Sequence, residues 1–184
     1  NKTLYFGDNK SLTDQKPDIL EKSDSYMYDP TVGYTSMGFL TGLGLNIGLP
    51  IDQRVDDAKS LIYTSEKMSE DIEVTGIPKI ILYVSSTSEI TSFVVRLCDI
   101  TSDGKSALVS KGYLNVTHRD SHTKPEYLIP GKKYRLEIDM DALSYIFKKE
   151  HKIRVSISCS DFPVIWPMPT HALNTIYKGK DDSS

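Results

Sequence analysis

Short apolar runs separated by turn residues recur along most of this chain, and they constrain its fold more than any other feature. Runs rich in valine, isoleucine and aromatic residues fit the pleated, half-buried surface of a β-strand. Glycine, proline and Asp-Gly pairs mark turns every ten or so residues. The expected strands cover residues 3–6, 61–63, 71–76, 79–84, 93–100, 107–117, 134–140, 153–159 and 171–177. This pattern predicts an all-β, antiparallel β-sandwich of jelly-roll type.

Three of the expected strands have patterns that say more about their place in a sheet. Residues 79–84 are apolar on both faces, which predicts a central strand covered on both sides. Residues 134–140 alternate strictly between apolar and charged side chains, as in a half-buried strand. Arg96 and Asp99 break the alternation of residues 93–100, which indicates a bulge or a half-buried edge, and Gly112 is a second candidate for a bulge.

Two segments are not expected to be strands. Residues 141–149 have the spacing of one short helix of about two turns, with Asp141 as the N-cap. The polar residues 10–25 are interpreted as a surface connection. The chain has neither βαβ spacing nor a G-x-G-x-x-G motif, so an α/β nucleotide-binding fold is not indicated.

A glycine-rich apolar segment interrupts this pattern between Tyr26 and Glu66. Its five glycines predict a loop, because each permits positive φ and costs backbone entropy in a helix or strand. Exposed loops are usually polar, whereas residues 37–51 carry no charged side chain. The segment is therefore expected to lie against the chain's own core or against another domain.

Composition excludes several classes of function. A chain of 184 residues is most simply one domain, and a net charge of −3 offers no basic surface for nucleic acid. No apolar run reaches the roughly 20 residues needed to cross a membrane, and no leader sequence is visible, which favours a cytoplasmic location. Cys98 and Cys159 both lie in apolar strands and are expected to be free, buried thiols.

No pattern in the chain assembles a catalytic constellation. The nearest approach to a G-x-S-x-G nucleophile elbow surrounds Ser36, but it has one residue too many before the serine and no strand-then-helix context. His118 and His122 are spaced i,i+4, yet in a strand-to-loop segment this spacing is not expected to bring two rings together. The sequence thus predicts no catalytic, cofactor-binding or metal-binding residues.

Other polar and aromatic groups are given structural interpretations. The runs Asp139-Met140-Asp141 and Asp56-Asp57 have the chemistry of calcium ligands but not the spacing of a calcium loop. Arg54, which lies between Asp52 and these later aspartates, is interpreted as the centre of an ion-pair cluster at a turn. Trp166, placed among three prolines, is interpreted as a plug that closes one end of the sandwich, in preference to an exposed platform for a sugar.

A set of motifs along the chain resembles one family of proteins. The motifs, in chain order, are Tyr26-x-Tyr28-Asp29-Pro30, Asp52-Gln53-Arg54, Tyr63-Thr64-Ser65-Glu66, Val74-Thr75-Gly76-x-Pro78, Asp99-x-x-x-Asp103-Gly104, Pro130-Gly131, His151-Lys152-Ile153-Arg154-Val155 and Ser158-x-Ser160-x-Phe162-Pro163. Together they resemble the C-terminal domain of the serine hydrolases that include X-Pro dipeptidyl-peptidases and cocaine esterase. The sequence departs from that family's pattern where Glu150 replaces the usual glycine before the histidine, and where the run from Glu89 to Phe93 lacks the usual aspartate.

The resemblance implies a galactose-binding-domain-like jelly roll that follows a catalytic α/β-hydrolase domain. In such enzymes the serine, aspartate and histidine of the triad belong to the hydrolase domain, so none is assigned to this sequence. Residues 1–184 are therefore expected to be a single C-terminal domain, inactive alone, with the catalytic domain upstream and absent from this chain. The expected role is to pack on that domain and to shape its active-site cleft or an oligomer interface.

These expectations assign two sets of residues. The uncharged loop supplies the candidates for contact between domains: Phe39, Leu40, Leu43 and Leu45. The motifs at its two ends supply the expected structural staples: Tyr28, Asp29, Pro30, Asp52, Gln53 and Arg54. The expected partners are the hydrolase domain of the same polypeptide or a second copy of the chain, and neither nucleic acid nor a membrane. The alternative is a free-standing carbohydrate-binding module.

Overall fold

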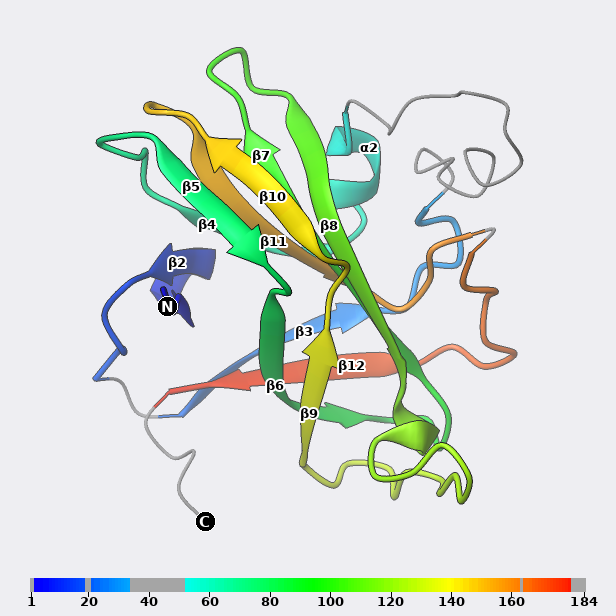
Figure 1. Ribbon diagram of the computed structural model, residues 1–184. Helices are drawn as coiled ribbons and strands as arrows, with labels where there is room; N and C mark the ends of the chain where they lie inside the picture. Colours follow the sequence, from blue (N-terminus) through cyan, green and yellow to red (C-terminus); the bar gives the residue numbers. More distant parts are fainter. Residues whose placement is uncertain (1, 19–20, 34–51, 163, 180–184) are drawn as a thin grey trace.

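The computed structural model describes residues 2–18, 21–33, 52–162 and 164–179, and it consists mostly of antiparallel β-strands (Figure 1). The strands are β1 (Tyr5–Phe6), β2 (Ser11–Thr13), β3 (Lys22–Met27), β4 (Leu61–Ser65), β5 (Ile72–Gly76), β6 (Lys79–Ser86), β7 (Ser92–Ile100), β8 (Ser106–Asn115), β9 (Tyr134–Asp139), β10 (Leu143–Phe147), β11 (Lys152–Ser158) and β12 (Leu173–Lys178). The helical pieces are η1 (Asp8–Lys10), α2 (Arg54–Asp57) and η3 (Val116–His118).

The strands form two larger sheets and one separate pair. One sheet has the order β1-β2-β4-β11-β7-β8, the second has the order β3-β12-β6-β9, and β10 pairs with β5. The antiparallel partners are nested along the chain: β7 with β8, β6 with β9, β5 with β10, β4 with β11 and β3 with β12. Among the described strands, only β2 and β4 pair in parallel.

The hydrophobic core lies between the two larger sheets. Both sheets contribute side chains that are almost completely buried, among them Tyr63, Leu82, Phe93, Val95, Leu136, Ile157 and Ile176. Each such side chain stabilises the fold by roughly 1.5–3 kcal/mol relative to an exposed position. On β9, Leu136 and Ile138 are buried while Arg135 and Glu137 are exposed, which confirms the alternation predicted for this strand.

The position of β7 resolves the two interpretations of its broken alternation. The strand lies between β11 and β8, so it is not an edge, and its register shifts between Leu97 and Cys98, so a bulge is present. The second predicted bulge, at Gly112, is wrong, because Gly112 pairs regularly with Val95. A Cβ atom at Gly112 would lie 2.8 Å from the carbonyl oxygen of Asp139. Close approach of the two backbones therefore accounts for this glycine.

Several predictions about individual segments are wrong. Residues 143–147 form strand β10 rather than a helix, because they pair with β5 from Leu143 opposite Gly76 to Phe147 opposite Ile72. Cross-strand pairing of this kind outweighs the weak intrinsic preference of a two-turn helix. The surface connection expected over residues 10–25 is also wrong in part, because it contains β2 and the first four residues of β3, whose polar side chains suit strands with an exposed face. On β6, Ile81 is 46% exposed, so the strand is not covered on both sides.

Candidate domain-contact surface

The Asp52-Gln53-Arg54 motif forms the turn that leads into α2 and joins it to β8. Arg54 Nε donates a hydrogen bond to Asp52 Oδ2 at 2.8 Å on the exposed side of the turn. Asp52 Oδ1 accepts from the Ser106 N–H at 3.3 Å, and the Gln53 N–H donates to the Ser106 carbonyl at 2.7 Å. The Gln53 side chain is completely buried, without a hydrogen-bond partner in the part of the chain that the structure describes.

Arg54 pairs with Asp52 as predicted, but the two aspartates of α2 pair with arginines from the sheet and not with Arg54. Asp56 Oδ2 lies 3.5 Å from Arg96 Nη1, and both side chains are at most 1% exposed. Asp57 Oδ2 accepts from Arg154 Nη1 at 2.9 Å. Buried charges are tolerated only when they are paired and hydrogen-bonded. These two pairs therefore fasten α2 to β7 and β11.

The Tyr28-Asp29-Pro30 motif forms a turn that reaches the same region. Asp29 Oδ1 accepts hydrogen bonds from the Thr31 N–H at 2.8 Å and from Thr31 Oγ1 at 2.6 Å, which closes an Asx turn. The side-chain bond from Thr31 is the largest of the effects that lower the pKa of Asp29. Ser160 Oγ donates to the Asp29 carbonyl at 2.7 Å, and the Gly33 N–H donates to Asp56 Oδ1 at 3.1 Å.

A third buried pair completes this arrangement. Asp161 Oδ2 accepts from Lys111 Nζ at 2.8 Å and from the Tyr113 hydroxyl at 3.2 Å, with Asp161 fully buried. We call the three pairs, Asp56–Arg96, Asp57–Arg154 and Asp161–Lys111, the buried ionic cluster. Its sheet members were not found from the sequence; the only signal was a charged residue inside an apolar run, as at Arg96.

An exposed apolar ridge lies beside the buried ionic cluster. It consists of Phe162, Val164 and Trp166, which are 40%, 39% and 73% exposed. The rings of Phe162 and Trp166 lie 6.3 Å apart, and the Phe162 N–H donates to the Val32 carbonyl at 3.2 Å. Trp166 therefore does not plug the sandwich. The Ile165 N–H donates to the Asp161 carbonyl and closes a short turn. The ring of Trp166, the next residue, faces outward.

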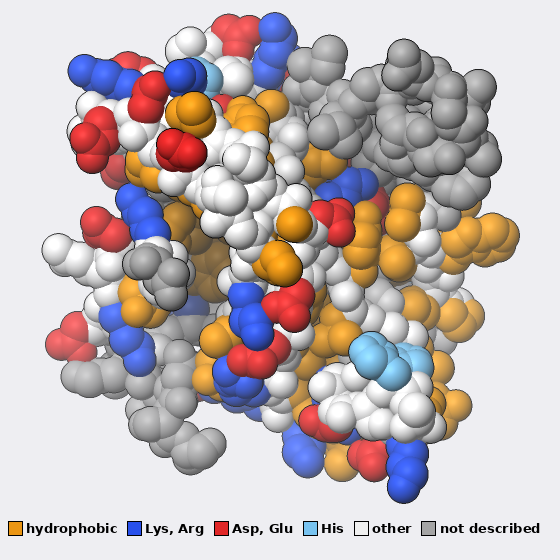
Figure 2. Space-filling model, in the orientation of Figure 1, with side chains coloured by type: hydrophobic (Ala, Val, Ile, Leu, Met, Phe, Trp, Pro, Cys, Tyr) orange, Lys and Arg blue, Asp and Glu red, His pale blue; other side chains and the backbone are white. Residues whose placement is uncertain are grey.

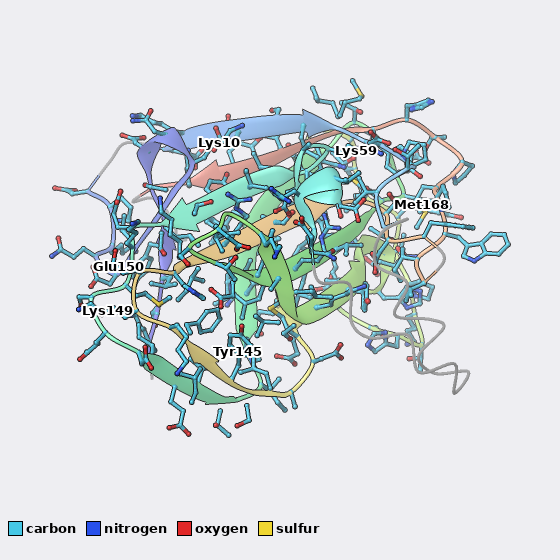
Figure 3. The ribbon with its side chains drawn as sticks, turned by 90° about the horizontal axis from the view of Figure 1, so that it is seen from above. Lys10, Lys59, Tyr145, Lys149, Glu150 and Met168 are labelled. Atoms are coloured by element: carbon cyan, nitrogen blue, oxygen red, sulfur yellow. The ribbon has the colours of Figure 1, made fainter. Side chains whose placement is uncertain are left out.

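Further apolar side chains lie at the neighbouring ends of β3 and β12. Met27 and Leu173 are cross-strand partners, 59% and 39% exposed. Figure 2 shows hydrophobic side chains gathered on this side of the molecule, over the ends of β3 and β12. Figure 3 places Met168, which follows the ridge, at the same end of the molecule as α2 and Lys59. The predicted contact residues Phe39, Leu40, Leu43 and Leu45, like Ser36, lie outside the described residues.

A buried aspartate, a histidine and a tyrosine form the most enzyme-like group in the structure. His151 Nδ1 lies 2.9 Å from Asp99 Oδ2, and the Tyr145 hydroxyl donates to the same oxygen at 2.9 Å. Burial, followed by this hydrogen bond, raises the pKa of Tyr145 to about 12. Among the described residues, no serine or cysteine side chain is hydrogen-bonded to His151. The group therefore lacks a nucleophile and ties β10 to β7.

Among the residues that the structure describes, the remaining reactive side chains give no further catalytic group. Cys98 and Cys159 are free and buried, as predicted, and burial raises the pKa values of their thiols to about 12 and about 11. Within the described ranges, no cluster of three or more His, Cys, Asp or Glu side chains is suited to a metal ion. The rings of His118 and His122 lie 5.6 Å apart, so the prediction that their spacing would keep them apart is wrong.

Two polar grooves flank η1, with volumes of about 470 and about 630 Å³. Lys22 Nζ and Lys178 Nζ, which line the first groove, donate to Asp8 and Asp24 at 2.9 and 2.6 Å. These charges are already matched within the groove. The helices of the described segments do not have the length and apolar character required to cross a membrane.

The geometry defines an antiparallel β-domain that combines the buried ionic cluster with an exposed apolar ridge. Comparison with known proteins identifies the family. Residues 1–182 match the model of the X-Pro dipeptidyl-peptidase C-terminal non-catalytic domain. The chain therefore belongs to this family of non-catalytic domains of serine hydrolases, and the resemblance seen in the motifs is confirmed.

Individual relatives agree with this assignment. The chain is 33% identical over 145 residues to cocaine esterase of Rhodococcus sp. (strain MB1 Bresler), covering 78% of this chain and 25% of that protein. It is 31% identical over 179 residues to a putative serine esterase of Mycobacterium tuberculosis (strain CDC 1551 / Oshkosh), covering 86% and 28%. The chain thus spans about a quarter of the length of these relatives.

Solved structures share the fold at lower sequence identity. An α-amino acid ester hydrolase superposes with a TM-score of 0.81 at 19% identity, covering 97% of this chain and 34% of that chain. An aminopeptidase from a marine sediment archaeon, Thaumarchaeota archaeon, superposes with a TM-score of 0.79 at 19% identity, covering 96% and 34%. In both, the matched fold is one part of a larger hydrolase chain.

Proposed function

We propose that this chain packs, through the apolar ridge, against an α/β-hydrolase domain of the same polypeptide and forms part of the wall of its active-site cleft. The observation that carries the proposal is the 73% exposure of Trp166 on a turn anchored by Asp161. A large exposed aromatic side chain on a rigid support is typical of a contact surface. The parent protein would be a serine hydrolase that transfers an acyl group to water, and this domain would contribute no catalytic residue.

Size and apolar area support the proposal. The curated relatives extend well beyond the matched quarter of their length, which leaves room for a separate catalytic domain. Contacts between domains of one chain commonly bury about 600–1,500 Å². An aromatic side chain buries roughly 150–250 Å² in total, and Trp166, which is 73% exposed, can contribute most of that area, whereas Phe162, at 40%, can contribute less than half of it. Phe39, Leu40, Leu43 and Leu45 are proposed to extend the same surface, and a contact between two copies of the chain is the alternative use of it.

We also infer that residues 1–184 form a single domain with jelly-roll topology. The nested strand pairs support this inference, because a jelly roll is a long antiparallel hairpin that has been rolled up. Successive nested pairs also alternate between the sheets: β3–β12 and β6–β9 belong to one sheet, β4–β11 and β7–β8 to the other. The pair β5–β10 forms its own two-stranded sheet, and in the nested order it lies between the pairs β4–β11 and β6–β9.

The contact can be tested with the single tryptophan of the chain, which is Trp166. The chain labelled with 5-fluorotryptophan gives one ¹⁹F resonance, which is followed while the separately expressed hydrolase domain is added. The expected result is a shifted resonance together with reduced hydrogen exchange over residues 159–173. In a second measurement, Trp166→Ser is expected to weaken binding at least tenfold, whereas Tyr127→Ser, at a residue that is 67% exposed, leaves it unchanged.

Two outcomes would count against the proposal. One is a ¹⁹F resonance and an exchange pattern that stay the same at saturating hydrolase domain. The other is equal loss of binding in Trp166→Ser and Tyr127→Ser. Thermal unfolding of both variants serves as the control, because exposed side chains are expected to contribute little to the stability of the isolated chain.

A carbohydrate-binding role is the second candidate, and the exposure of both Phe162 and Trp166 favours it. Adjacent exposed aromatic rings can stack on the faces of sugars. The same labelled chain distinguishes the two functions when it is titrated with soluble oligosaccharides. A saturable shift with sugar and none with the hydrolase domain would replace the first proposal with the second.

A further inference from the structure

His118 and His122 bring two imidazole rings together at and just after η3, which follows β8. The ring centroids lie 5.6 Å apart with an angle of 33° between the planes. His118 is the last residue of η3, at the end of β8, and His122 lies exposed in the loop that follows. No other pair of histidines in the described part of the chain is in ring contact.

The backbone around His118 is held on several sides. The Asn115 side chain caps η3 by accepting from the Thr117 N–H at 3.1 Å, and the Val116 N–H donates to the Thr91 carbonyl at 3.0 Å. Arg119 Nη1 donates to the carbonyls of Val116 and Glu126 at 3.2 and 2.8 Å. His118 is therefore held in place by its backbone, and His122 lies exposed in the loop that follows.

The environment of His118 contains an unexplained polar atom. Its Nδ1 is buried and has no hydrogen-bond partner among the described residues. Buried polar atoms are nearly always paired, and an unpaired one often marks a site for water or an ion. Imidazole nitrogen is also a preferred ligand of zinc, copper and nickel.

The separation of the rings fits a shared ion. An ion about 2.0–2.1 Å from a ring nitrogen lies roughly 3.2 Å from the ring centroid, so two rings on one tetrahedral ion have centroids about 5.2 Å apart, close to the observed 5.6 Å. We propose that His118 and His122 form a binding site for a single divalent transition-metal ion. Because no third His, Cys, Asp or Glu within the described ranges completes the set, water fills the remaining coordination positions.

The charges around the pair do not oppose a cation. Arg119, the residue after His118, is engaged with Asp120 Oδ2 at 3.1 Å and Glu126 Oε2 at 3.6 Å. Its guanidinium also lies 4.6 Å from the centre of the Tyr134 ring. The two carboxylates therefore offset the arginine charge. The site would be open and weaker than a four-ligand structural zinc site.

Copper is the most sensitive probe, because Cu²⁺ binds nitrogen sites more tightly than the other divalent first-row ions. The 184-residue chain is titrated with Cu²⁺ in a weakly coordinating buffer by calorimetry, and the complex is examined by electron paramagnetic resonance. The expected result is one ion per chain with coupling to two nitrogen nuclei. His122→Gln, at an exposed position, is expected to lower the affinity at least tenfold, and His118→Gln should do the same.

His171→Gln is the matched control, since His171 is also exposed and its ring lies 6.1 Å from that of Tyr28 rather than beside another histidine. Its affinity for Cu²⁺ should equal that of the unmodified chain. The inference is overturned if His122→Gln binds Cu²⁺ as tightly as the unmodified chain, or if all three variants lose affinity equally, which would indicate adventitious binding only.

Discussion

Arg96 and Arg54 each face an aspartate near α2, but they differ in their exposure to water. The side chain of Arg96 is 0% exposed and its Nη2 donates to Ser60 Oγ and Ser156 Oγ at 2.8 and 3.2 Å. The side chain of Arg54 is 57% exposed beside Asp52. Removing one partner of a buried pair leaves an uncompensated charge, whereas an exposed pair is screened by solvent.

We expect Arg96→Ala to lower the free energy of unfolding by about 3–5 kcal/mol, because Asp56 would remain buried without its counter-charge. Arg54→Ala should leave the free energy of unfolding almost unchanged. Urea denaturation of the 184-residue chain measures both variants. If the two arginine variants unfold at the same urea concentration, the buried ionic cluster does not have the role assigned to it.

Asp24 carries the pH dependence that is easiest to measure. It accepts from Lys178 Nζ at 2.6 Å and from the Tyr63 hydroxyl at 2.8 Å. Burial alone would raise the pKa of Asp24, but these hydrogen bonds outweigh burial and hold the pKa below its usual value of 3.8. A pKa that is lower in the folded state means that stability is present above the unfolded pKa and is lost as pH falls through the folded pKa.

Asp24→Asn should therefore be less stable than the unmodified chain at pH 7, since Lys178 would lose its counter-charge. As the pH falls below the unfolded pKa, the difference between the two proteins should shrink, and it should vanish below the folded pKa of Asp24, where protonation removes the same charge from the unmodified chain. Urea midpoints measured from pH 7 down to about pH 2.5 test this expectation. The exposed Asp14→Asn is the control and should follow the unmodified chain throughout; a constant difference between Asp24→Asn and the unmodified chain would contradict the assignment.

At the level of secondary-structure elements, a comparison of two glycines with positive φ distinguishes the effect of backbone strain from that of steric clash. Gly33 has φ +102° and Gly131 has φ +79°. A Cβ atom would meet nothing within 4 Å at Gly131, but at Gly33 it would lie 2.5 Å from backbone atoms of Asp161 and Phe162. Gly33 is thus the position at which the Tyr28-Asp29-Pro30 turn is pressed against the base of the apolar ridge.

Gly131→Ala is expected to cost about 1–2 kcal/mol of stability from backbone strain alone. Gly33→Ala should cost clearly more, because the ridge segment must also move away. Thermal and urea unfolding measure the difference, and the ¹⁹F resonance of labelled Trp166 should shift in Gly33→Ala and stay in place in Gly131→Ala. Equal destabilisation with no shift would show that the turn does not position the ridge.

The elements also show how far the sequence could predict the structure. The strict alternation of residues 134–140 predicted β9, because it can be read from residues next to one another in the sequence. The motifs predicted the family for the same reason, since each is a short run of the sequence. Residues 143–147 become a strand only through pairing with β5, more than 65 positions earlier in the chain, as for Thr75 and Ser144, which are 69 positions apart. The partners of Asp56 and Asp57 could not be predicted either, because Arg96 and Arg154 reach them through the tertiary fold.

At the scale of the whole molecule, the nested strand pairs differ in the length of chain that must be closed to form them, and so in the entropy that pairing costs. β7 and β8 are joined by a short turn around Gly104, whereas β3 and β12 place Ser25 and Thr175 in contact across 150 positions of chain. Closing long segments costs more entropy, and folds dominated by distant pairs fold in milliseconds to seconds. The inner pairs are therefore expected to form first and the outermost pair last.

Two buried β-branched side chains test this order. Val95 on β7 and Ile176 on β12 are both 0% exposed. Val95→Ala and Ile176→Val each remove methyl groups from the core, and Ile→Val alone typically costs about 0.5–1.5 kcal/mol. Stopped-flow folding and unfolding in urea should show that Val95→Ala mainly slows folding, whereas Ile176→Val mainly accelerates unfolding. The opposite assignment of the two effects would mean that the ends of the chain pair before its centre, and that β3 and β12 nucleate the sandwich rather than close it.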